Sequence, residues 1–519
     1  MEKSLAITVL FFLVVSTVIW AWKFLNKFWL RPKRLEKLLR QQGLQGNPYR
    51  FLVGDTKQMV KMQKEAQSKP MNDLSDDITP RINAHLLHTL HKFGKNCFVW
   101  FGPTPRLIMM DPNQVKQVLN NVPDFPKQTW NPLVKFIGTG LANYEGHKWA
   151  KHRKIVTPAF SLEKLKMMLP SFFESCNDMI GKWDEMLGSD GSREMDVWPF
   201  LQKLSKDVIS RTAYGSSYQE GRRIFELLQE QCQLTLKILP TLHIPGWWFV
   251  PTKTHRRMRK VNRDIESSIK SLIKKREEAM KAGEVSENDF LGTLLESNQK
   301  EMKEYGNNNK FGMTIKDVIE ECKLFYFAGQ ETTSVLLVWS LVLLSRYLDW
   351  QERAREEVLQ VFGNRTPDFD GLSHLKIVTM ILYEVLRLYP PSIQLVRTTH
   401  KDMKLEDLLV PAGVQVYLPI LQIHHDCGIW GEDANEFKPE RFSEGIAKAT
   451  NGQVSYIPFG WGPRICLGQN FALLEAKMAL SMILQRFHLE ISPSYAHAPT
   501  IALLVQPQHG AHIILSKLK

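Results

Sequence analysis

The sequence predicts a mainly α-helical protein with small β-sheets, preceded by one N-terminal transmembrane helix. Three observations predict this fold class: an apolar run near the N-terminus, helical patterning from about residue 112 to about residue 390, and short β-like runs on either side of it. Of the 519 residues, 44% are hydrophobic and 23% are charged, which is the balance of a folded chain that buries a sizeable core.

The apolar run at residues 5–22 contains 18 residues without a formal charge, just enough to span a bilayer as a helix. Trp20 and Trp22 stand at its end, where indole rings favour the membrane interface. One basic side chain precedes the run and several follow it: Lys3, then Lys23, Lys27, Arg31, Lys33 and Arg34. The positive-inside rule therefore places the rest of the chain in the cytosol. A cleaved signal peptide is the competing interpretation, but the bulky exit lacks the small residues of a cleavage site.

This pattern predicts three parts. Residues 1–22 form the membrane anchor, residues 23–48 form a basic hinge that ends in Gly43, Gly46 and Pro48, and residues 49–519 form the cytosolic domain. Two short β-like runs follow the hinge at 97–101 and 107–110, and two more lie near the C-terminus at 501–505 and 511–515. Residues 296–312 are predicted to form a polar loop.

Charge and cysteine content narrow the class of protein. The net charge of +13 suits an anionic membrane surface or an acidic partner protein. The sequence has no zinc-finger spacing, RNA-binding aromatic signature or long Lys/Arg block, so nucleic acid is disfavoured, and a solvated lysine-rich surface explains the charge equally well. The six cysteines are far apart and form no CxxC pair, which disfavours a zinc site or a disulfide framework and favours a reducing compartment.

An apolar segment at 234–251 contains Trp247, Trp248 and Phe249 and is followed by a basic run. It is either core or a second membrane contact, in which the aromatic side chains dip into the interface.

Residues 314–350 are predicted to form one long helix that is apolar nearly all round between Leu324 and Leu344, and a helix of this kind is buried. Its middle carries Glu331 and Thr332, and a carboxylate at mid-bilayer would be costly, so a buried core helix fits better than a second membrane span. A carboxylate beside a hydroxyl in an apolar wall suits delivery of protons into a dry cavity. A satisfied structural polar cluster is the alternative.

Glu384 and Arg387 stand at i, i+3 on one predicted helix, within pairing range. Such a pair is expected by chance in a long chain and contributes little at a surface. Arg441 downstream offers a second guanidinium, and a buried Glu-Arg-Arg network is plausible only if every member is satisfied.

Cys466 lies in a Gly/Pro-rich loop at 459–468 that leads into a helical pattern at 471–484. Most lone cysteines are inert buried hydrophobes. Here Gly462 and Gly468 let the backbone approach a flat ligand closely. The following helix N-terminus and Arg464 both favour thiolate over thiol, and backbone N–H groups aimed at the sulfur would tune it as a ligand.

The spacing Phe-x-x-Gly-x-Arg-x-Cys-x-Gly at 459–468 resembles the haem-binding loop of the cytochrome P450 superfamily. Ala-Gly-x-Glu-Thr-Thr at 328–333, Glu-x-x-Arg at 384–387 and Pro-Glu-Arg-Phe at 439–442 stand in the family's order, and the Trp149 to Arg153 segment resembles its Trp-x-x-x-Arg helix. The resemblance covers essentially the whole chain. It implies the cytochrome P450 fold, in which haem is sandwiched between a long central helix and the helix after the cysteine loop.

The resemblance also implies a role for each motif residue. Cys466 is the axial thiolate ligand of the haem iron, which pushes electron density onto the iron and favours O–O cleavage. The other implied residues are the haem-propionate contacts Trp149, Arg153, Arg397 and Arg464, the haem-binding loop residues Phe459, Gly462 and Gly468, the O₂-activating pair Glu331 and Thr332, and the structural network of Glu384, Arg387 and Arg441.

The implied activity is monooxygenation, with haem b (iron protoporphyrin IX) as cofactor, O₂ as oxidant and electrons from an NADPH-dependent reductase docked on basic residues. The resemblance also implies a monomeric catalytic unit in the endoplasmic reticulum membrane. Its expected partners are membrane lipid and a hydrophobic small-molecule substrate. An O₂-independent isomerase or dehydratase commonly lacks the threonine, and a non-catalytic haem-binding protein would not need the acid–alcohol pair.

At finer grain, the hinge sequence at 31–46 and Ala-Asn-Tyr-Glu-Gly at 142–146 resemble the plant clan that includes secologanin synthase and triterpenoid oxidases. This clan implies a plant terpenoid substrate. An oleanane (β-amyrin-type) triterpenoid is the first prediction, and iridoids and gibberellins are the alternatives.

Overall fold

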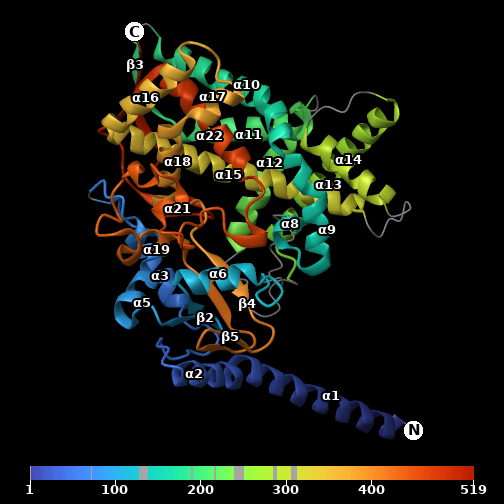
Figure 1. Ribbon diagram of the computed structural model, residues 1–519. Helices are drawn as coiled ribbons and strands as arrows, with labels where there is room; N and C mark the ends of the chain where they lie inside the picture. Colours follow the sequence, from blue (N-terminus) through green and yellow to red (C-terminus); the bar gives the residue numbers. More distant parts are fainter. Residues whose placement is uncertain are drawn as a thin grey trace. The chain divides into compact units, whose positions relative to one another are not determined.

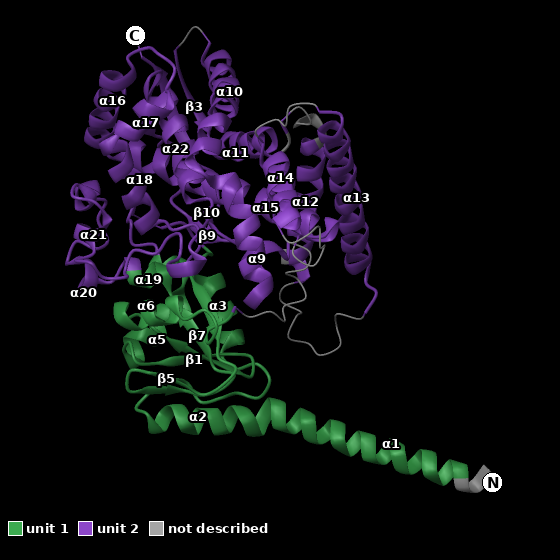
Figure 2. Ribbon diagram, turned by 45° about the vertical axis from the view of Figure 1, so that its right-hand side comes forward, with its two compact units in different colours: residues 1–68, 79–126, 394–423 green, residues 69–78, 127–393, 424–519 purple. Residues whose placement is uncertain are grey.

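The computed structural model describes residues 2–71, 73–127, 138–188, 191–215, 218–238, 250–283, 289–304 and 312–518. The chain divides into two compact units (Figure 2). Unit 1 comprises residues 1–68, 79–126 and 394–423, and unit 2 comprises residues 69–78, 127–393 and 424–519. The predicted membrane contact at Trp247, Trp248 and Phe249 lies outside the described residues.

Unit 1 consists of short helices and a small sheet. Its helices are α1 (Glu2–Leu25), α2 (Arg31–Gln41), α3 (Thr56–Ala66), α4 (Thr79–Ile82), α5 (Ala84–Phe93), α6 (Pro112–Asn120) and α19 (Ile420–His424). Its strands are β1 (Phe98–Phe101), β2 (Thr104–Ile108), β4 (Leu395–Thr398), β5 (Met403–Leu405), β6 (Leu408–Val410) and β7 (Gln415–Leu418).

Helix α1 extends away from the rest of unit 1 (Figure 2). A π-helical turn, Asn26–Leu30, joins it to α2 without a break, so the chain is helical through most of the predicted hinge and leaves the helix only after Gln41. Residues 5–41 are long and apolar enough to cross a membrane, and none of the most apolar stretch is buried. An apolar helix without a protein partner needs lipid or another apolar surface to cover it. The boundaries predicted at residues 22 and 48 remain a prediction.

The four-stranded sheet of unit 1 has the order β1-β2-β7-β4. Strands β1 and β2 form an antiparallel hairpin with Val99 opposite Arg106, whereas β7 joins β2 in parallel with Val416 opposite Leu107. The predicted β-like runs at 97–101 and 107–110 correspond to β1 and β2, although β2 begins three residues earlier, at Thr104.

Unit 2 is mainly helical (Figure 1). Its helices are α8 (Gly140–Asn143), α9 (Gly146–Val156), α10 (Leu162–Leu187), α11 (Trp198–Tyr214), α12 (Tyr218–Ile238), α13 (Lys253–Lys281), α14 (Phe290–Glu304), α15 (Ile315–Arg346), α16 (Leu348–Phe362), α17 (Phe369–His374), α18 (Lys376–Leu388), α20 (Cys427–Trp430), α21 (Ile446–Ala449) and α22 (Gln469–Leu484). Its strands are β3 (Ser192–Asp196), β8 (Phe487–Ile491), β9 (Pro499–Ile501), β10 (Val505–Pro507) and β11 (His512–Lys517), arranged as a β3-β11-β8 sheet and a β9-β10 hairpin.

Two local predictions for unit 2 were wrong. The segment at 296–304 is not a loop, because α14 continues to Glu304 and buries Asn298 through hydrogen bonds with the backbone of Met313. The run at 501–505 is not one strand, because β9 ends at Ile501 and the chain turns back before β10 begins at Val505.

Helix α15 is the long central helix of unit 2, packed against α11, α18 and α22. It begins with a capping box in which Thr314 and Asp317 satisfy each other's backbone N–H groups. It ends at Arg346, four residues earlier than predicted, and α16 follows at once. Its apolar window is 72% buried, so α15 passes the same length and composition test as α1 but is a core helix rather than a membrane span.

Gly329 lets α11 approach α15 closely. A Cβ atom at Gly329 would lie 2.3 Å from Cδ1 of Ile209, which belongs to α11. A larger residue at this position would force the Ile209 side chain to move, so the glycine that weakens the helix in the sequence allows this close packing.

Candidate active site

All five predicted motifs lie in unit 2, and three of them are on α15, on the cysteine loop before α22 and on α9. On α15, Ala328 is exposed and Thr332 is half-buried, although the rest of the helix is largely buried. These residues are one turn apart, and the Thr332 hydroxyl donates a hydrogen bond to the Ala328 carbonyl at 2.6 Å. Since this face of a core helix is not filled by side chains, it borders open space.

Glu331 lies next to that face. Its Oε1 accepts a hydrogen bond from Nε2 of Gln330 at 3.0 Å. Burial raises the pKa of the Glu331 carboxyl, and the Lys206 ammonium on α11 opposes this shift. The group is thus biased toward the protonated form compared with an exposed glutamate.

The cysteine loop is a tight turn closed by its own backbone. The N–H of Cys466 donates to the carbonyl of Phe459 at 2.9 Å, and Gly460 and Gly462 have φ values of 75° and 70°, which side chains disfavour. The Gly468 N–H, at the N-terminus of α22, donates to the Cys466 sulfur. The predicted backbone donor to the sulfur is therefore present.

The Cys466 side chain is exposed, and it opens onto a groove of about 720 Å³ lined by α9, residues 157–161 and the start of α22. Although the side chain reaches the groove, the protein around it removes much of the water that would solvate a thiolate and so raises the pKa of the Cys466 thiol, while the Gly468 N–H and the charges of Arg153 and Lys127 lower it. The protein alone thus favours the thiol. A bound metal cation would reverse this balance, because coordination deprotonates a thiol outright.

The positive charge beside Cys466, which the sequence pattern assigned to Arg464, comes from Arg153 instead. Arg153 of α9 donates from Nη1 to the Ile465 carbonyl at 2.8 Å and supplies positive charge near the sulfur. Arg464 instead pairs with the Glu145 carboxylate, and its guanidinium lies 4.5 Å from the centre of the Trp149 ring. Trp149, Arg153 and Arg464 therefore come together around the cysteine loop.

Arg397 is the one predicted site residue in unit 1. It is buried in β4, where its Nη1 donates to the Val396 carbonyl at 3.1 Å. Its predicted contact with a haem propionate remains a prediction.

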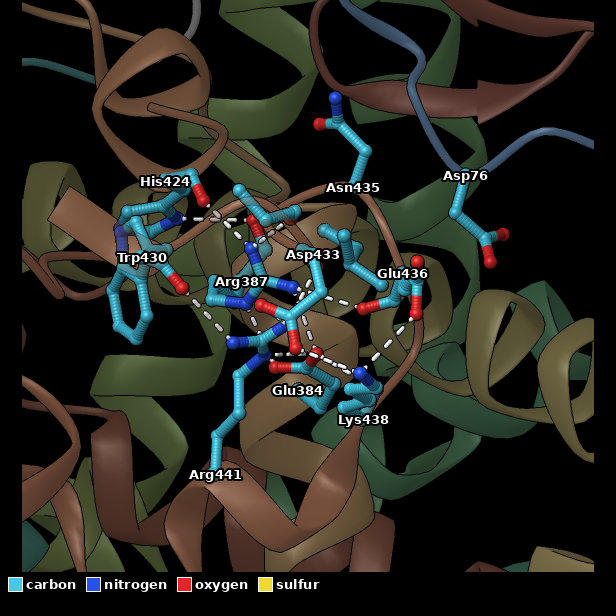
Figure 3. A network of polar contacts seen from close by, with 12 residues as sticks. Asp76, Glu384, Arg387, His424, Trp430, Asp433, Asn435, Glu436, Lys438 and Arg441 are labelled. Carbon is cyan, nitrogen blue, oxygen red and sulfur yellow. Dashed lines mark hydrogen bonds and ion pairs between the residues drawn. The ribbon is translucent and has the colours of Figure 1, made fainter. Parts of the chain in front are cut away.

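Glu384, Arg387 and Arg441 form one buried network (Figure 3). The Arg387 guanidinium makes a two-pronged pair with Glu384, from Nε at 2.8 Å and from Nη2 at 2.7 Å, and both side chains are fully buried. Its remaining N–H groups donate to the backbone carbonyls of His424, Ala434 and Glu436, so all five donors of Arg387 have an acceptor.

Arg441 approaches Glu384 from the other side, with 3.4 Å between its Nε and Oε1 of Glu384. It also pairs with Asp433 at 2.7 Å. Glu384 and Arg387 at the centre of the network are thus satisfied, whereas the buried Nε of Arg441 forms no hydrogen bond within the described residues and reaches Glu384 only as an ion pair.

Several residues near this site gave no signal in the sequence. His152 on α9 is fully buried, with its Nδ1 2.6 Å from Oε1 of Glu321 on α15, and Tyr144 packs edge-on against its ring. Phe325 of α15 stacks on Phe290 with ring centres 4.0 Å apart and joins a cluster with Phe160 and Phe471. The His152–Glu321 and Phe325–Phe471 contacts attach α9 and α22 to α15, and sequence spacing cannot reveal them because they join segments far apart in the chain.

Glu475 of α22 is a second buried carboxyl that the sequence did not indicate. Its Oε1 accepts a hydrogen bond from the Ser205 hydroxyl at 2.9 Å, and burial raises its pKa to about 8. In the unfolded chain the pKa is near 4.5, so the folded state holds a proton that the unfolded state releases between these two values.

We expect this proton to make stability depend on pH. The contribution of protonated Glu475 to the free energy of unfolding is fully present below pH 4.5 and is lost as the pH rises toward 8. Between these values the free energy of unfolding falls by about 1.4 kcal/mol per pH unit. Thermal unfolding of wild type and Glu475→Gln from pH 5 to 8 measures it, and the variant should lack this component of the slope. Equal slopes in the two proteins would contradict the prediction.

The described residues fit a haem. Nε of Arg464 is buried and has no hydrogen-bond partner within the described part of the chain, so a donor is left for an anionic group. The thiol of Cys466 is accessible, and the Ala328 face of α15 is open. The site combines a cysteine loop ahead of a helix, arginines beside that loop and a long core helix with an acid–alcohol pair. This combination defines the haem-thiolate class of enzymes.

The comparisons with known proteins identify the family. The family model described as cytochrome P450 matches residues 24–514, and the chain therefore belongs to the cytochrome P450 family. A cyanobacterial CYP120A1 structure with bound retinoic acid has the same fold, with a TM-score of 0.72 at 23% identity over 83% of this chain and 93% of that one. This confirms the predicted fold class.

Three plant relatives match nearly the whole chain. Cytochrome P450 72A68 of Medicago truncatula is 57% identical over 98% of this chain and 97% of its own. The 11-oxo-beta-amyrin 30-oxidase of Glycyrrhiza uralensis is 58% identical over 98% of both chains. Secologanin synthase 1 of Catharanthus roseus is 53% identical over 100% of this chain and 98% of its own.

The protein is accordingly a cytochrome P450 monooxygenase that uses haem b, O₂ and electrons supplied by a reductase. Members of the family generally receive these electrons from NADPH–cytochrome P450 reductase and bind hydrophobic substrates.

Proposed function

We propose that this protein hydroxylates a plant terpenoid, with an oleanane (β-amyrin-type) triterpenoid as the first candidate. The observation that carries this proposal is its 58% identity, over 98% of both chains, to a relative named for oxidation of 11-oxo-beta-amyrin. An iridoid is the second candidate, because a secologanin synthase is 53% identical over the whole chain.

In this proposal Cys466 binds the haem iron as thiolate, and Trp149, Arg153, Arg397 and Arg464 contact the propionates. Phe459, Gly462 and Gly468 would let the backbone of the loop approach the haem closely. When bound, the haem supplies the activation of O₂, and the thiolate favours O–O cleavage. The network of Glu384, Arg387 and Arg441 holds the protein scaffold behind this loop.

Glu331 and Thr332 supply protons in this proposal. The raised pKa of Glu331 lets its carboxyl carry a proton within unit 2. The Thr332 hydroxyl now donates to Ala328, and rotation about χ1 would redirect its proton into the open space beside the helix. Acid and alcohol together would thus deliver protons where water is scarce.

The test is conversion of a substrate panel. The chain is co-expressed with a plant NADPH reductase in yeast membranes and supplied with triterpenoids, iridoids and gibberellins under ¹⁸O-labelled O₂. An oleanane product that gains one labelled oxygen supports the proposal. A labelled product from iridoids alone would replace the first candidate with the second. A product without label would favour an O₂-independent isomerase or dehydratase.

We expect Thr332→Ala to uncouple NADPH use from product formation. General acid catalysis contributes about 10²-fold or more to such steps, so product formed per NADPH consumed should fall by at least about tenfold. Thr332→Ser, which retains the hydroxyl, should restore most of it. Ser340→Ala is the matched control, because Ser340 donates to the Leu336 carbonyl with the same i−4 geometry at 2.8 Å. Unchanged coupling in Thr332→Ala would exclude the proposed role.

We further propose that α1 anchors the protein in the endoplasmic reticulum membrane with the catalytic domain in the cytosol. The support is an apolar helix whose most apolar stretch is not buried against the described chain, followed by basic residues. A variant that lacks residues 2–25 should move from the carbonate-washed membrane pellet to the supernatant. Retention in the pellet would show that α1 is not the main anchor and would direct attention to Trp247, Trp248 and Phe249.

A further inference from the structure

Glu145 occupies an unusual place immediately before α9. It stands at the N-cap position of this helix, but its side chain does not cap the helix. Its Oε1 accepts a hydrogen bond from the Lys127 N–H at 2.9 Å, and its Oε2 pairs with Nη2 of Arg464 in the cysteine loop. One carboxylate thus joins the chain before α8, the start of α9 and the loop that carries Cys466.

The Arg464 guanidinium is held on two sides. The Glu145 carboxylate pairs with Nη2 of Arg464, and Cζ of Arg464 lies 4.5 Å from the centre of the Trp149 ring. An arginine stacked on an aromatic ring and paired at one edge loses most of its rotational freedom. The guanidinium plane is therefore fixed by two residues from one short segment of chain.

The Nε–H group of Arg464 is the informative one. Its Nε is buried and has no hydrogen-bond partner within the residues that the structure describes. A buried, charged N–H without an acceptor is costly, and haem carries two anionic propionates. Because Glu145 pairs with Nη2 and not with Nε, the Nε–H group is left available to a bound anion.

We propose that Glu145 is a positioning residue for the haem: it orients Arg464 so that the Nε–H of the guanidinium donates a hydrogen bond to an anionic group of the cofactor. This inference rests on the proposed role of the Cys466 loop as the haem site. Glu145 itself does not contact the cofactor in this proposal. It acts through Arg464, and its negative charge also offsets the charges of Arg153, Arg464 and Lys127 near the loop.

Two variants separate orientation from charge. Glu145→Gln keeps an oxygen acceptor of the same length and removes the charge, whereas Glu145→Ala removes both. The readouts are the rate of haem transfer to apomyoglobin and the haem reduction potential. We expect Glu145→Ala to release haem at least fivefold faster than wild type and Glu145→Gln to lie between the two. Loss of a nearby negative charge should favour reduction of the haem iron in both variants. The equilibrium constant for reduction should rise about tenfold, which raises the reduction potential by about 59 mV for one electron.

Arg464→Lys tests whether Glu145 acts through Arg464. Lysine keeps the positive charge but has no planar fork to orient, so adding Glu145→Ala to Arg464→Lys should accelerate haem release less than twofold further. Glu278→Gln is the matched control, since Glu278 is an exposed glutamate that pairs with Lys274 on α13 at 3.7 Å. It should leave both readouts unchanged.

The inference would be overturned if Glu145→Ala and Glu145→Gln released haem at the wild-type rate and kept the wild-type reduction potential. It would also be overturned if Glu145→Ala accelerated haem release by the same factor in the Arg464→Lys background as in wild type. Thermal unfolding of Glu145→Gln shows that the fold is kept. The carbon monoxide spectrum of Cys466→Ser reports the ligand assignment separately, so a failure of the haem-site proposal is distinguishable from a failure of this inference.

Discussion

Cys466→Ser should abolish the carbon monoxide difference spectrum typical of thiolate-ligated haem and lower product formation by more than about a hundredfold. Replacing partners that only orient a metal ligand typically costs 10- to 100-fold in affinity or activity, so loss of the ligand itself should exceed that range. Serine keeps the shape of the loop and the Gly468 N–H donor but cannot supply a thiolate. The spectrum and the turnover of co-expressed membranes measure the two effects.

Cys427→Ser is the control for this experiment, because Cys427 is also exposed and lies outside the loop. It should retain the spectrum and the turnover of wild type. A thiolate spectrum that persisted in Cys466→Ser would disprove the ligand assignment and require another cysteine to bind the iron.

Arg387→Ala should destabilise the protein by about 3–5 kcal/mol, the usual result of removing one partner of a buried ion pair. The substitution leaves the Glu384 carboxylate in a site with no solvent exposure, and it removes the donors to the His424, Ala434 and Glu436 carbonyls. Arg441 remains near Glu384 at 3.4 Å and offsets part of the charge. The urea midpoint of unfolding and the yield of haem-loaded protein measure the loss.

The double variant Glu384→Ala with Arg387→Ala separates charge from packing. It removes the unpaired charge that each single variant leaves behind, so its cost should be less than the sum of the two single costs. Lys274→Ala with Glu278→Ala removes an exposed pair of the same kind on α13 and should cost less than about 1 kcal/mol. Additive costs at Glu384 and Arg387 would mean that the two residues do not act as a unit.

Local sequence patterns predicted much of the fold. Periodicity indicated the N-terminal apolar helix, the long buried helix at α15 and the helical body, because an apolar stripe or run records the surface that a helix buries. Element ends were predicted less well. The helix α15 ends earlier than predicted, just before Tyr347, whose hydroxyl donates to the carboxylate of Asp76 in a distant part of the chain. The helix α14 extends into the predicted loop, where Asn298 bonds the backbone of Met313 beyond the helix end. Neither contact can be predicted from the local pattern.

Within the candidate site, the sequence by itself determined which chemical groups are present: a cysteine in a glycine-rich loop, an acid beside an alcohol in an apolar helix, and a glutamate one turn before an arginine. Those groups follow from residue type and short spacing, which sequence preserves directly. The tertiary structure alone decided the electrostatic environment of these groups. In the folded protein Arg464 pairs with Glu145 and packs on Trp149, and the charge of Arg153 lies near Cys466. Burial raises the pKa of Glu475 to about 8. The physical reason is that burial and charge proximity are set by segments hundreds of residues apart, and no pattern within one segment records what packs against it.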